Sequence, residues 1–288
     1  MRTVLSALSV LLAVVLTAVA VPALWLDRNL VDESGFVSLL SPMSTDKQLQ
    51  STLVSNLDTA VLSDSGIPSV LRPVAQQAVQ GLATNLVSDP GFPQAWNDTL
   101  RASHQLNFSP DKASANAFEL ELSPMAGLMA RRLGSSLNVN IPPPSSLQVQ
   151  VGTAQQRSWL TGAQRLAALS LPLALGAVLA FALGLLWARR RGVALAWAGI
   201  GLLLIAALYQ GAVGLLPSVV SAQASAGSMS STFGTRAAEL AAASFETWIL
   251  GLAICGAVFL VLGAVLGALR RRRRARTEST WGLASMDS

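Results

Sequence analysis

Four apolar runs, each long enough to cross a lipid bilayer, dominate the pattern of the chain. They cover Val4–Leu26, Leu166–Ala188, Gly192–Leu216 and Trp248–Leu269, and none contains a charged side chain. About 20 apolar residues, each rising ~1.5 Å along a helix, span a hydrocarbon core of ~30 Å. The sequence therefore predicts four transmembrane helices.

The first run has a second interpretation. Arg2, an apolar core and the small residues Ala18-Val19-Ala20 also fit a secretory signal with a cleavage site after Ala20. The run continues through Trp25, however, whereas the apolar core of a signal peptide has about 7–15 residues. We expect residues 1–26 to remain as an uncleaved anchor, and a mature chain that starts at Val21 would contradict this.

Residues 27–165 are polar enough to form one domain, and the first part has helical periodicity. Thr45–Val61 predicts an amphipathic helix capped by Thr45, and a second helix is expected from Pro68 to Val87. A third begins at Ser88 and ends before Ser109. The apolar side of this third helix consists of Phe92, Trp96, Leu100 and His104.

The pattern then alternates, as in half-buried strands, over Phe118–Leu122 and Leu147–Val151. Between them Met125–Leu133 is expected to be helical, with Gly134 as its C-cap. The two strands pair either in parallel, through a right-handed crossover, or antiparallel. The predicted fold class is mainly α: a four-helix transmembrane bundle with a mostly helical extracytoplasmic domain that contains a small β element.

The distribution of charge predicts the orientation of the spans. Only 12% of the 288 residues are charged, against about 25% in ordinary soluble domains. Half of the 20 basic residues lie at the span ends, in three places: Arg2, Arg189–Arg191, and Arg270–Arg274 with Arg276. Because arginine and lysine concentrate in cytoplasmic loops, both termini are expected in the cytoplasm. Residues 27–165, with nine basic and eleven acidic residues, are expected outside the cell membrane.

These expectations give one layout for the whole chain. It consists of helix 1–26, extracytoplasmic domain 27–165, helix 166–188, cytoplasmic arginine turn 189–191, helix 192–216, outer loop with a short helix 217–247, helix 248–269 and cytoplasmic polybasic tail 270–288.

Several local motifs of the chain resemble those of a group of known membrane proteins. They are Trp25, Leu40-Ser41-Pro42 with Asp46 and Gln48, Phe92-x3-Trp96-x4-Arg101-Ala102-Ser103-His104, the Leu120–Pro124 segment and the arginine turn after the second span. In these the chain resembles a group of uncharacterised integral membrane proteins of actinobacteria, which have one span, an outer domain and three further spans. Members commonly have Asn where this chain has Leu100. The resemblance implies no known activity.

Trp96, Arg101 and His104 are the candidate partner-binding face, for an acidic or glycan partner. The alternative is that Trp96 anchors the helix in a core and His104 caps a polar edge. Glu119 and Glu121 form a carboxylate pair that the alternation places on the solvent side of a strand.

Further chemistry is limited by composition. Cys255 is the only cysteine and His104 the only histidine, so intramolecular disulfides and Cys- or His-cluster metal sites are excluded. The sequence has no P-loop, dinucleotide fingerprint or nucleophile elbow with triad partners. We expect no catalytic residue, cofactor, metal or nucleic-acid partner, and spans without ionisable groups disfavour a self-sufficient transporter.

The glycines of the fourth span and the arginines that follow it predict what this span contacts. Gly256, Gly263 and Gly267 predict close helix packing, either within one chain or between copies in a homo-oligomer. The six arginines that follow the span are expected to contact lipid headgroups or to serve only as a topological signal. They are Arg270, Arg271, Arg272, Arg273, Arg274 and Arg276.

The favoured function is a non-enzymatic cell-envelope protein of the plasma membrane. Its extracytoplasmic domain would bind a partner or help envelope assembly. The alternative is an accessory or sensory subunit of a transport or signalling complex.

Overall fold

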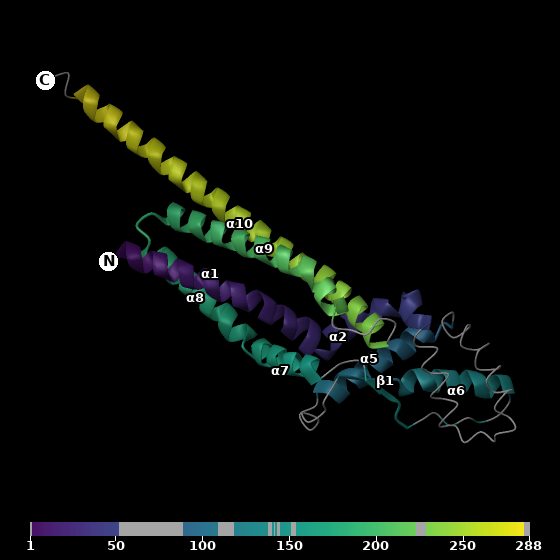
Figure 1. Cartoon of the computed structure of the whole chain (residues 1–288). Helices are drawn as coiled ribbons and strands as arrows, with labels where there is room; N and C mark the ends of the chain where they lie inside the picture. The colour runs from purple at the N-terminus through teal and green to yellow at the C-terminus, as the bar shows by residue number, and fades with distance from the viewer. Residues whose placement is uncertain are drawn as a thin grey trace. The chain divides into compact units, whose positions relative to one another are not determined.

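The computed structural model describes residues 2–51, 89–108, 118–137, 140, 142, 145–150, 154–222 and 229–284 (Figure 1). The chain divides into two compact units. The span unit comprises Met1–Trp25, Leu166–Gly214 and Phe245–Ser288, and the inserted unit comprises Leu26–Arg165 and Leu215–Ser244. The described elements are helices and one small two-stranded sheet, which confirms the predicted mainly α class.

The long helices are α1 (Arg2–Leu26), α8 (Ser170–Trp187), α9 (Arg191–Ala222) and α10 (Met229–Ala284). In the described part of the chain, four helical segments are long and apolar enough to cross a membrane: Arg2–Val31, Ser170–Trp187, Arg191–Leu216 and Ser231–Arg270. A helix satisfies its backbone hydrogen bonds internally, which a hydrocarbon environment requires. The chain is therefore a multi-pass membrane protein, as the apolar runs predict.

The second span begins later than the sequence predicts. A separate helix, α7 (Ala154–Ala168), covers the first three residues of the expected span, and α8 starts only at Ser170. The break lies at Leu169, whose φ of −93° and ψ of 1° leave the helical region. Hydropathy alone does not show such a break, because the apolar run continues across it with Ser170 as its one polar residue near the break.

Helix packing in the span unit relies on small residues and a few polar contacts. Ser6 of α1 donates a hydrogen bond to the backbone oxygen of Gly184 in α8 at 2.8 Å. Tyr209 of α9 donates to the backbone oxygen of Ala18 in α1. Phe181 of α8 and Phe259 of α10 stack with ring centroids 5.1 Å apart.

The inserted unit begins with a π-helical turn, η1 (Asp27–Val31), followed by α2 (Glu33–Leu40). Asp32 caps α2, because its carboxylate accepts a hydrogen bond from the Gly35 amide at 2.8 Å. Hydrogen bonds from the Ser34 hydroxyl and the Gly35 amide lower the pKa of Asp32. A side chain at Gly35 would place its Cβ 1.7 Å from the Arg28 carbonyl oxygen, so only glycine permits this approach.

The helix expected over Thr45–Val61 starts after a 3-10 turn, η2 (Ser41–Thr45), and its cap differs from the prediction. Asp46 caps the helix, because its carboxylate accepts from the Leu49 amide at 2.9 Å. The Thr45 hydroxyl instead donates to the Pro42 oxygen. The described part of this helix is 47–51; its remainder and the helix expected over Pro68–Val87 lie outside the described residues.

The third predicted helix is α5 (Phe92–Phe108), which begins later than expected and ends where expected. Asp89 starts it by accepting from the Gly91 amide at 2.7 Å. Arg132 of α6 (Ser123–Leu137) pairs with Asp89 at 2.5 Å, and hydrogen bonds from Arg132 and Gly91 lower the pKa of Asp89. Gly134 is not a C-cap, because α6 continues past it to Leu137 and Gly134 is buried within the helix.

The sheet pairs β1 (Glu119–Glu121) with β2 (Gln148–Gln150) antiparallel, with Leu120 opposite Val149. This excludes the parallel alternative. The other edge of β1 is bound by side chains of α5. Asn107 donates to the Glu119 oxygen at 2.6 Å and accepts from the Glu119 amide at 3.1 Å. Ser103 accepts from the Glu121 amide at 2.9 Å, so a three-residue strand is satisfied on both edges.

The hydrophobic core of the inserted unit lies between α2, α5, α6 and β1. Leu120 and Leu122 are fully buried, whereas Glu119 and Glu121 on the alternate positions are half-buried. The buried residues of this core are Phe36, Val37, Leu40, Met43, Leu49, Phe92, Ala95, Trp96, Leu100, Leu120, Leu122, Met125, Ala126, Leu128, Met129 and Phe233.

Candidate functional site

Trp96 is part of the core rather than of a binding surface. Its side chain is fully buried, and its indole N–H donates to the Leu40 backbone oxygen at 3.1 Å. The hydrogen bond joins α5 to the end of α2, so the indole uses both its apolar area and its polar group inside the protein.

His104 lies on the same buried side of α5 and is 7% exposed. Its ring stacks on Phe108 with centroids 4.3 Å apart, and its Nε2 hydrogen-bonds the Val31 backbone oxygen at 2.9 Å. The imidazole therefore joins α5 to the end of η1 from a buried position, rather than capping a polar edge of the helix.

Arg101 is on the opposite, exposed side of α5. Its guanidinium pairs with Asp98 at 2.7 Å, and both side chains are 45% exposed. The structure therefore does not bring Trp96, Arg101 and His104 onto one accessible face. Of the three, Arg101 alone is exposed to a partner.

Glu121 has a defined structural task. Its carboxylate accepts hydrogen bonds from the amide of Leu147 at 2.9 Å and from both the amide and the hydroxyl of Ser123. Burial alone would raise the pKa of Glu121, but these hydrogen bonds, with one from Gln148, outweigh burial and lower the pKa. The carboxylate connects β1, the start of α6 and the start of β2, so Glu121 is not simply a solvated residue.

The glycines of the fourth span lie in two different environments. A Cβ on Gly263 would lie 2.6 Å from the Gly192 oxygen, and one on Gly256 would lie 3.0 Å from the Gly199 oxygen. Both are therefore packing positions between α9 and α10, which run side by side (Figure 1). A Cβ on Gly267 would meet nothing within 4 Å. The Cβ positions of Gly256 and Gly263 that meet α9 are thus seven residues apart, and Gly267 joins the contact through its backbone, because its amide nitrogen lies 3.2 Å from a Cβ built on Gly192.

The arginines after the fourth span are only partly described. Arg270 is exposed and donates from Nη1 to the Arg189 backbone oxygen at 3.1 Å, which ties α10 to the arginine turn; its contact with lipid headgroups stays a prediction. The side chains of the other five lie outside the described residues, so their headgroup contact is not confirmed and stays a prediction. These five are Arg271, Arg272, Arg273, Arg274 and Arg276.

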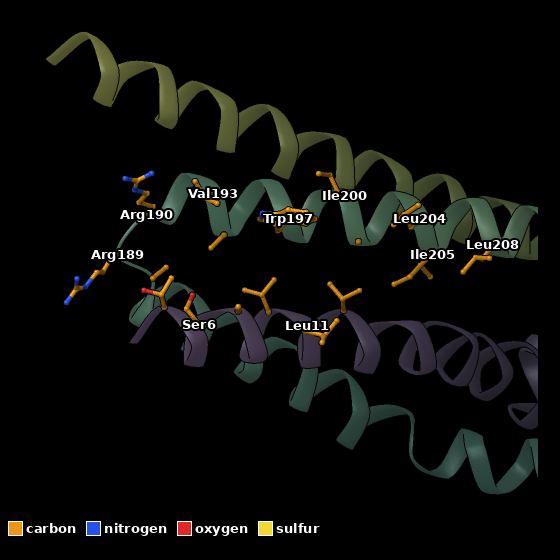
Figure 2. Close-up of a pocket in the computed structure, with 17 residues that line it drawn as sticks. Ser6, Leu11, Arg189, Arg190, Val193, Trp197, Ile200, Leu204, Ile205 and Leu208 are labelled. Carbon is orange, nitrogen blue, oxygen red and sulfur yellow. The ribbon is translucent and has the colours of Figure 1, made fainter. Parts of the chain in front are cut away.

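A cavity of about 820 Å³ lies between α1 and α9 in the span unit. Figure 2 shows side chains of the two helices facing one another across it, with Arg189 and Arg190 at one end and their guanidinium groups outermost. Its walls are formed by residues such as Leu11, Val193, Trp197 and Leu204. The sequence does not reveal this cavity, because a space between two helices leaves no periodic pattern; Arg189 and Arg190, with no acidic residue near them in the sequence, are the signal that points to it.

Among the described residues, no group of three or more His, Cys, Asp or Glu side chains lies close enough to hold a metal ion. Comparison with known proteins found no match: no family model, no curated protein and no solved structure matches the chain.

Proposed function

We propose that this is a non-enzymatic envelope protein of the plasma membrane, whose inserted unit lies outside the cell and binds another envelope component or helps to assemble one. The observation that carries the proposal is the division of the chain. The inserted unit has its own hydrophobic core, whereas the membrane-spanning segments supply an apolar base. We also propose membership in the actinobacterial group that the sequence resembles.

The orientation follows from the positions of the arginines. Arg189 and Arg190 lie between α8 and α9, Arg191 begins α9, and Arg270 lies at the same end of the span unit, bonded to Arg189. Arginine-rich ends are retained in the cytoplasm during insertion. This supports cytoplasmic termini and an external inserted unit.

The use of polar groups supports a binding role over catalysis. The imidazole of His104 and the carboxylate of Glu121 are engaged with backbone groups of their own unit. A general acid or base instead needs contact with a substrate. The exposed charges of the unit, such as Arg101 and Arg131, lie on helix surfaces where a partner could reach them.

The orientation is tested by cysteine labelling in a Cys255→Ser background. Ser135→Cys places a thiol on the exposed side of α6, and Arg191→Cys places one at the start of α9. A membrane-impermeant maleimide should label Ser135→Cys in intact cells and Arg191→Cys only after permeabilisation. The reverse result would overturn the orientation.

The binding role is tested by photo-crosslinking in intact cells. A photoreactive amino acid at Gln94, which is exposed on α5, should give one defined adduct with an envelope protein or glycan. The matched control is Leu179 on the lipid-facing side of α8, where the same adduct should be absent. Capture of a transporter or kinase subunit would favour the accessory-subunit alternative, and turnover of a substrate by the purified chain would refute a non-enzymatic role.

A further inference from the structure

The cavity between α1 and α9 exists because the two helices pack against different neighbours: α1 packs against α8, and α9 packs against α10. Gly184 of α8 lets α1 approach closely, since a Cβ there would lie 2.9 Å from Val10. Gly192 and Gly199 bring α9 against α10 in the same way. At the arginine end, α1 and α9 are therefore not packed on one another.

The two helices meet at Val14 and Gly201, which themselves line the cavity, so the cavity is a groove that runs past this contact. Gly201 of α9 faces Val14 of α1, because a Cβ on Gly201 would lie 2.8 Å from a Val14 methyl group. Tyr209 of α9 also donates a hydrogen bond to the backbone oxygen of Ala18 in α1. The α9 residues of the cavity wall extend from Val193 to Leu208, a rise of about 22 Å. One leaflet of a bilayer core is ~15 Å deep, so the cavity is long enough for the chain of a lipid.

Among the described residues, the charge at the open end has no acidic partner. The described residues give Arg189 and Arg190 no ion pair, and the sequence has no acidic residue between Glu121 and Glu239 or before Asp27. Arg270 adds a third guanidinium through its bond to the Arg189 oxygen. Guanidinium groups bind phosphate with two parallel hydrogen bonds, so an anion from outside the chain fits this end.

We propose that this cavity binds an anionic phospholipid, with one acyl chain between α1 and α9 and its phosphate beside Arg189 and Arg190. A second copy of the chain fits less well, because it would bring the same arginine-rich ends to the same depth of the bilayer. The lipid would fill the apolar space and neutralise the arginines together. The proposal is independent of the proposed function, since it holds for either orientation of the chain.

The test uses the full-length protein, purified in detergent and titrated with phosphatidylglycerol or phosphatidylcholine while native mass spectrometry counts bound lipids. Phosphatidylglycerol should bind more tightly than phosphatidylcholine. Arg190→Gln should weaken phosphatidylglycerol binding about fivefold, the loss of ~1 kcal/mol expected for one arginine near an anionic lipid. Arg191→Gln removes the same charge one residue away from the cavity wall and should have a smaller effect.

A second pair of variants tests the position of the acyl chain. Leu204→Trp fills the cavity from α9, whereas Leu179→Trp adds the same bulk to α8 outside it; the wild-type leucines are 61% and 63% exposed. Only Leu204→Trp should reduce lipid binding. Thermal unfolding without added lipid checks that each variant folds, and Ile200→Trp replaces Leu204→Trp if the latter does not.

Three results would overturn the proposal. One is equal binding of the two lipids, and another is an equal effect of Arg190→Gln and Arg191→Gln, which would mean general charge attraction. The third is unchanged phosphatidylglycerol binding in the cavity-filling variant. If that variant instead dissociated a dimer, the occupant would be a second copy of the chain.

Discussion

The two units of this chain differ in the side chains that they bury: the inserted unit buries large apolar residues, and the span unit buries mostly small ones. The largest fully buried residues of the described chain all belong to the inserted unit: Trp96, Phe92, Met43, Leu49, Leu100, Leu120, Leu122, Met125 and Met129. The buried residues of the span unit are mostly small, among them Ala13, Ala20, Ala23, Ala177, Ala180, Ala198 and Ala206.

The difference follows from the solvent of each unit. Burying apolar area away from water contributes ~25 cal/mol per Å², which favours large core residues in the inserted unit. Lipid is as apolar as leucine, so membrane helices gain little from burying large side chains and associate through close backbone contact. This explains why leucines such as Leu171, Leu175 and Leu208 remain exposed in the span unit, while glycines such as Gly184, Gly199 and Gly263 lie at helix contacts.

The largest effect that tests this comparison is expected from Trp96→Ala. The change leaves a cavity in the core and removes the donor to the Leu40 oxygen, so the inserted unit should lose about 3–5 kcal/mol of unfolding free energy. Hydrogen exchange of the α5 amides measures this loss in the full-length protein. Trp159→Ala, at a tryptophan that is 75% exposed, should change stability by less than ~0.5 kcal/mol. Equal losses would mean that Trp96 does not anchor a core.

A smaller effect is expected from Gly263→Val in the span unit. The new Cβ would lie 2.6 Å from the Gly192 oxygen, so α9 and α10 would have to separate at a cost of about 1–3 kcal/mol. Thermal unfolding in detergent and exchange of the α10 amides measure the effect. Gly267→Val is the matched control, because its side chain meets open space. If Gly267→Val were the more damaging variant, the four-residue glycine spacing would be the packing motif after all.

Acidification should act on the inserted unit through Glu121. Its pKa is lowered in the folded protein, so its hydrogen bonds stabilise the fold above the ordinary value of 4.5, and this contribution is lost as the pH falls through the folded pKa. Glu121→Gln should remove this part of the acid sensitivity and cost about 1 kcal/mol at neutral pH. Denaturant unfolding at several pH values measures both. Glu239→Gln, which removes a carboxylate of an exposed ion pair and none of the hydrogen bonds of Glu121, is the matched control.

The same comparison explains which features could be predicted from sequence. The four spans and the alternation around Leu120 are visible because a long apolar run or a period of two reports directly on burial. The ends of the elements were harder to predict. Thr45 and Asp46 are both good caps, and only the backbone path shows that Asp46 accepts from Leu49.

The candidate binding face was harder to predict from the sequence than the ends of the helices and strands. Trp96 and His104 share a side of α5 in the sequence, but whether that side is a core or a binding face depends on what packs against it. That packing comes from Leu40 and Val31, more than 50 residues away in the chain. The cavity between α1 and α9 likewise depends on which helices the glycines bring together, and spacing within one span does not contain this information.

The smallest effect on stability is expected from Arg101→Ala. Arg101 and Asp98 form an exposed pair within α5, and such pairs contribute about 0–1 kcal/mol, so the α5 amides should exchange nearly as in the wild type.

Because Arg101 is the exposed member of the original candidate face, the same variant separates stability from binding. A lower yield of the Gln94 crosslink with unchanged exchange would identify Arg101 as a partner contact. Arg131→Ala, on the exposed side of α6, is the control for a general loss of positive charge. If both variants reduced the crosslink equally, the partner would be responding to the net charge of the inserted unit rather than to the surface of α5.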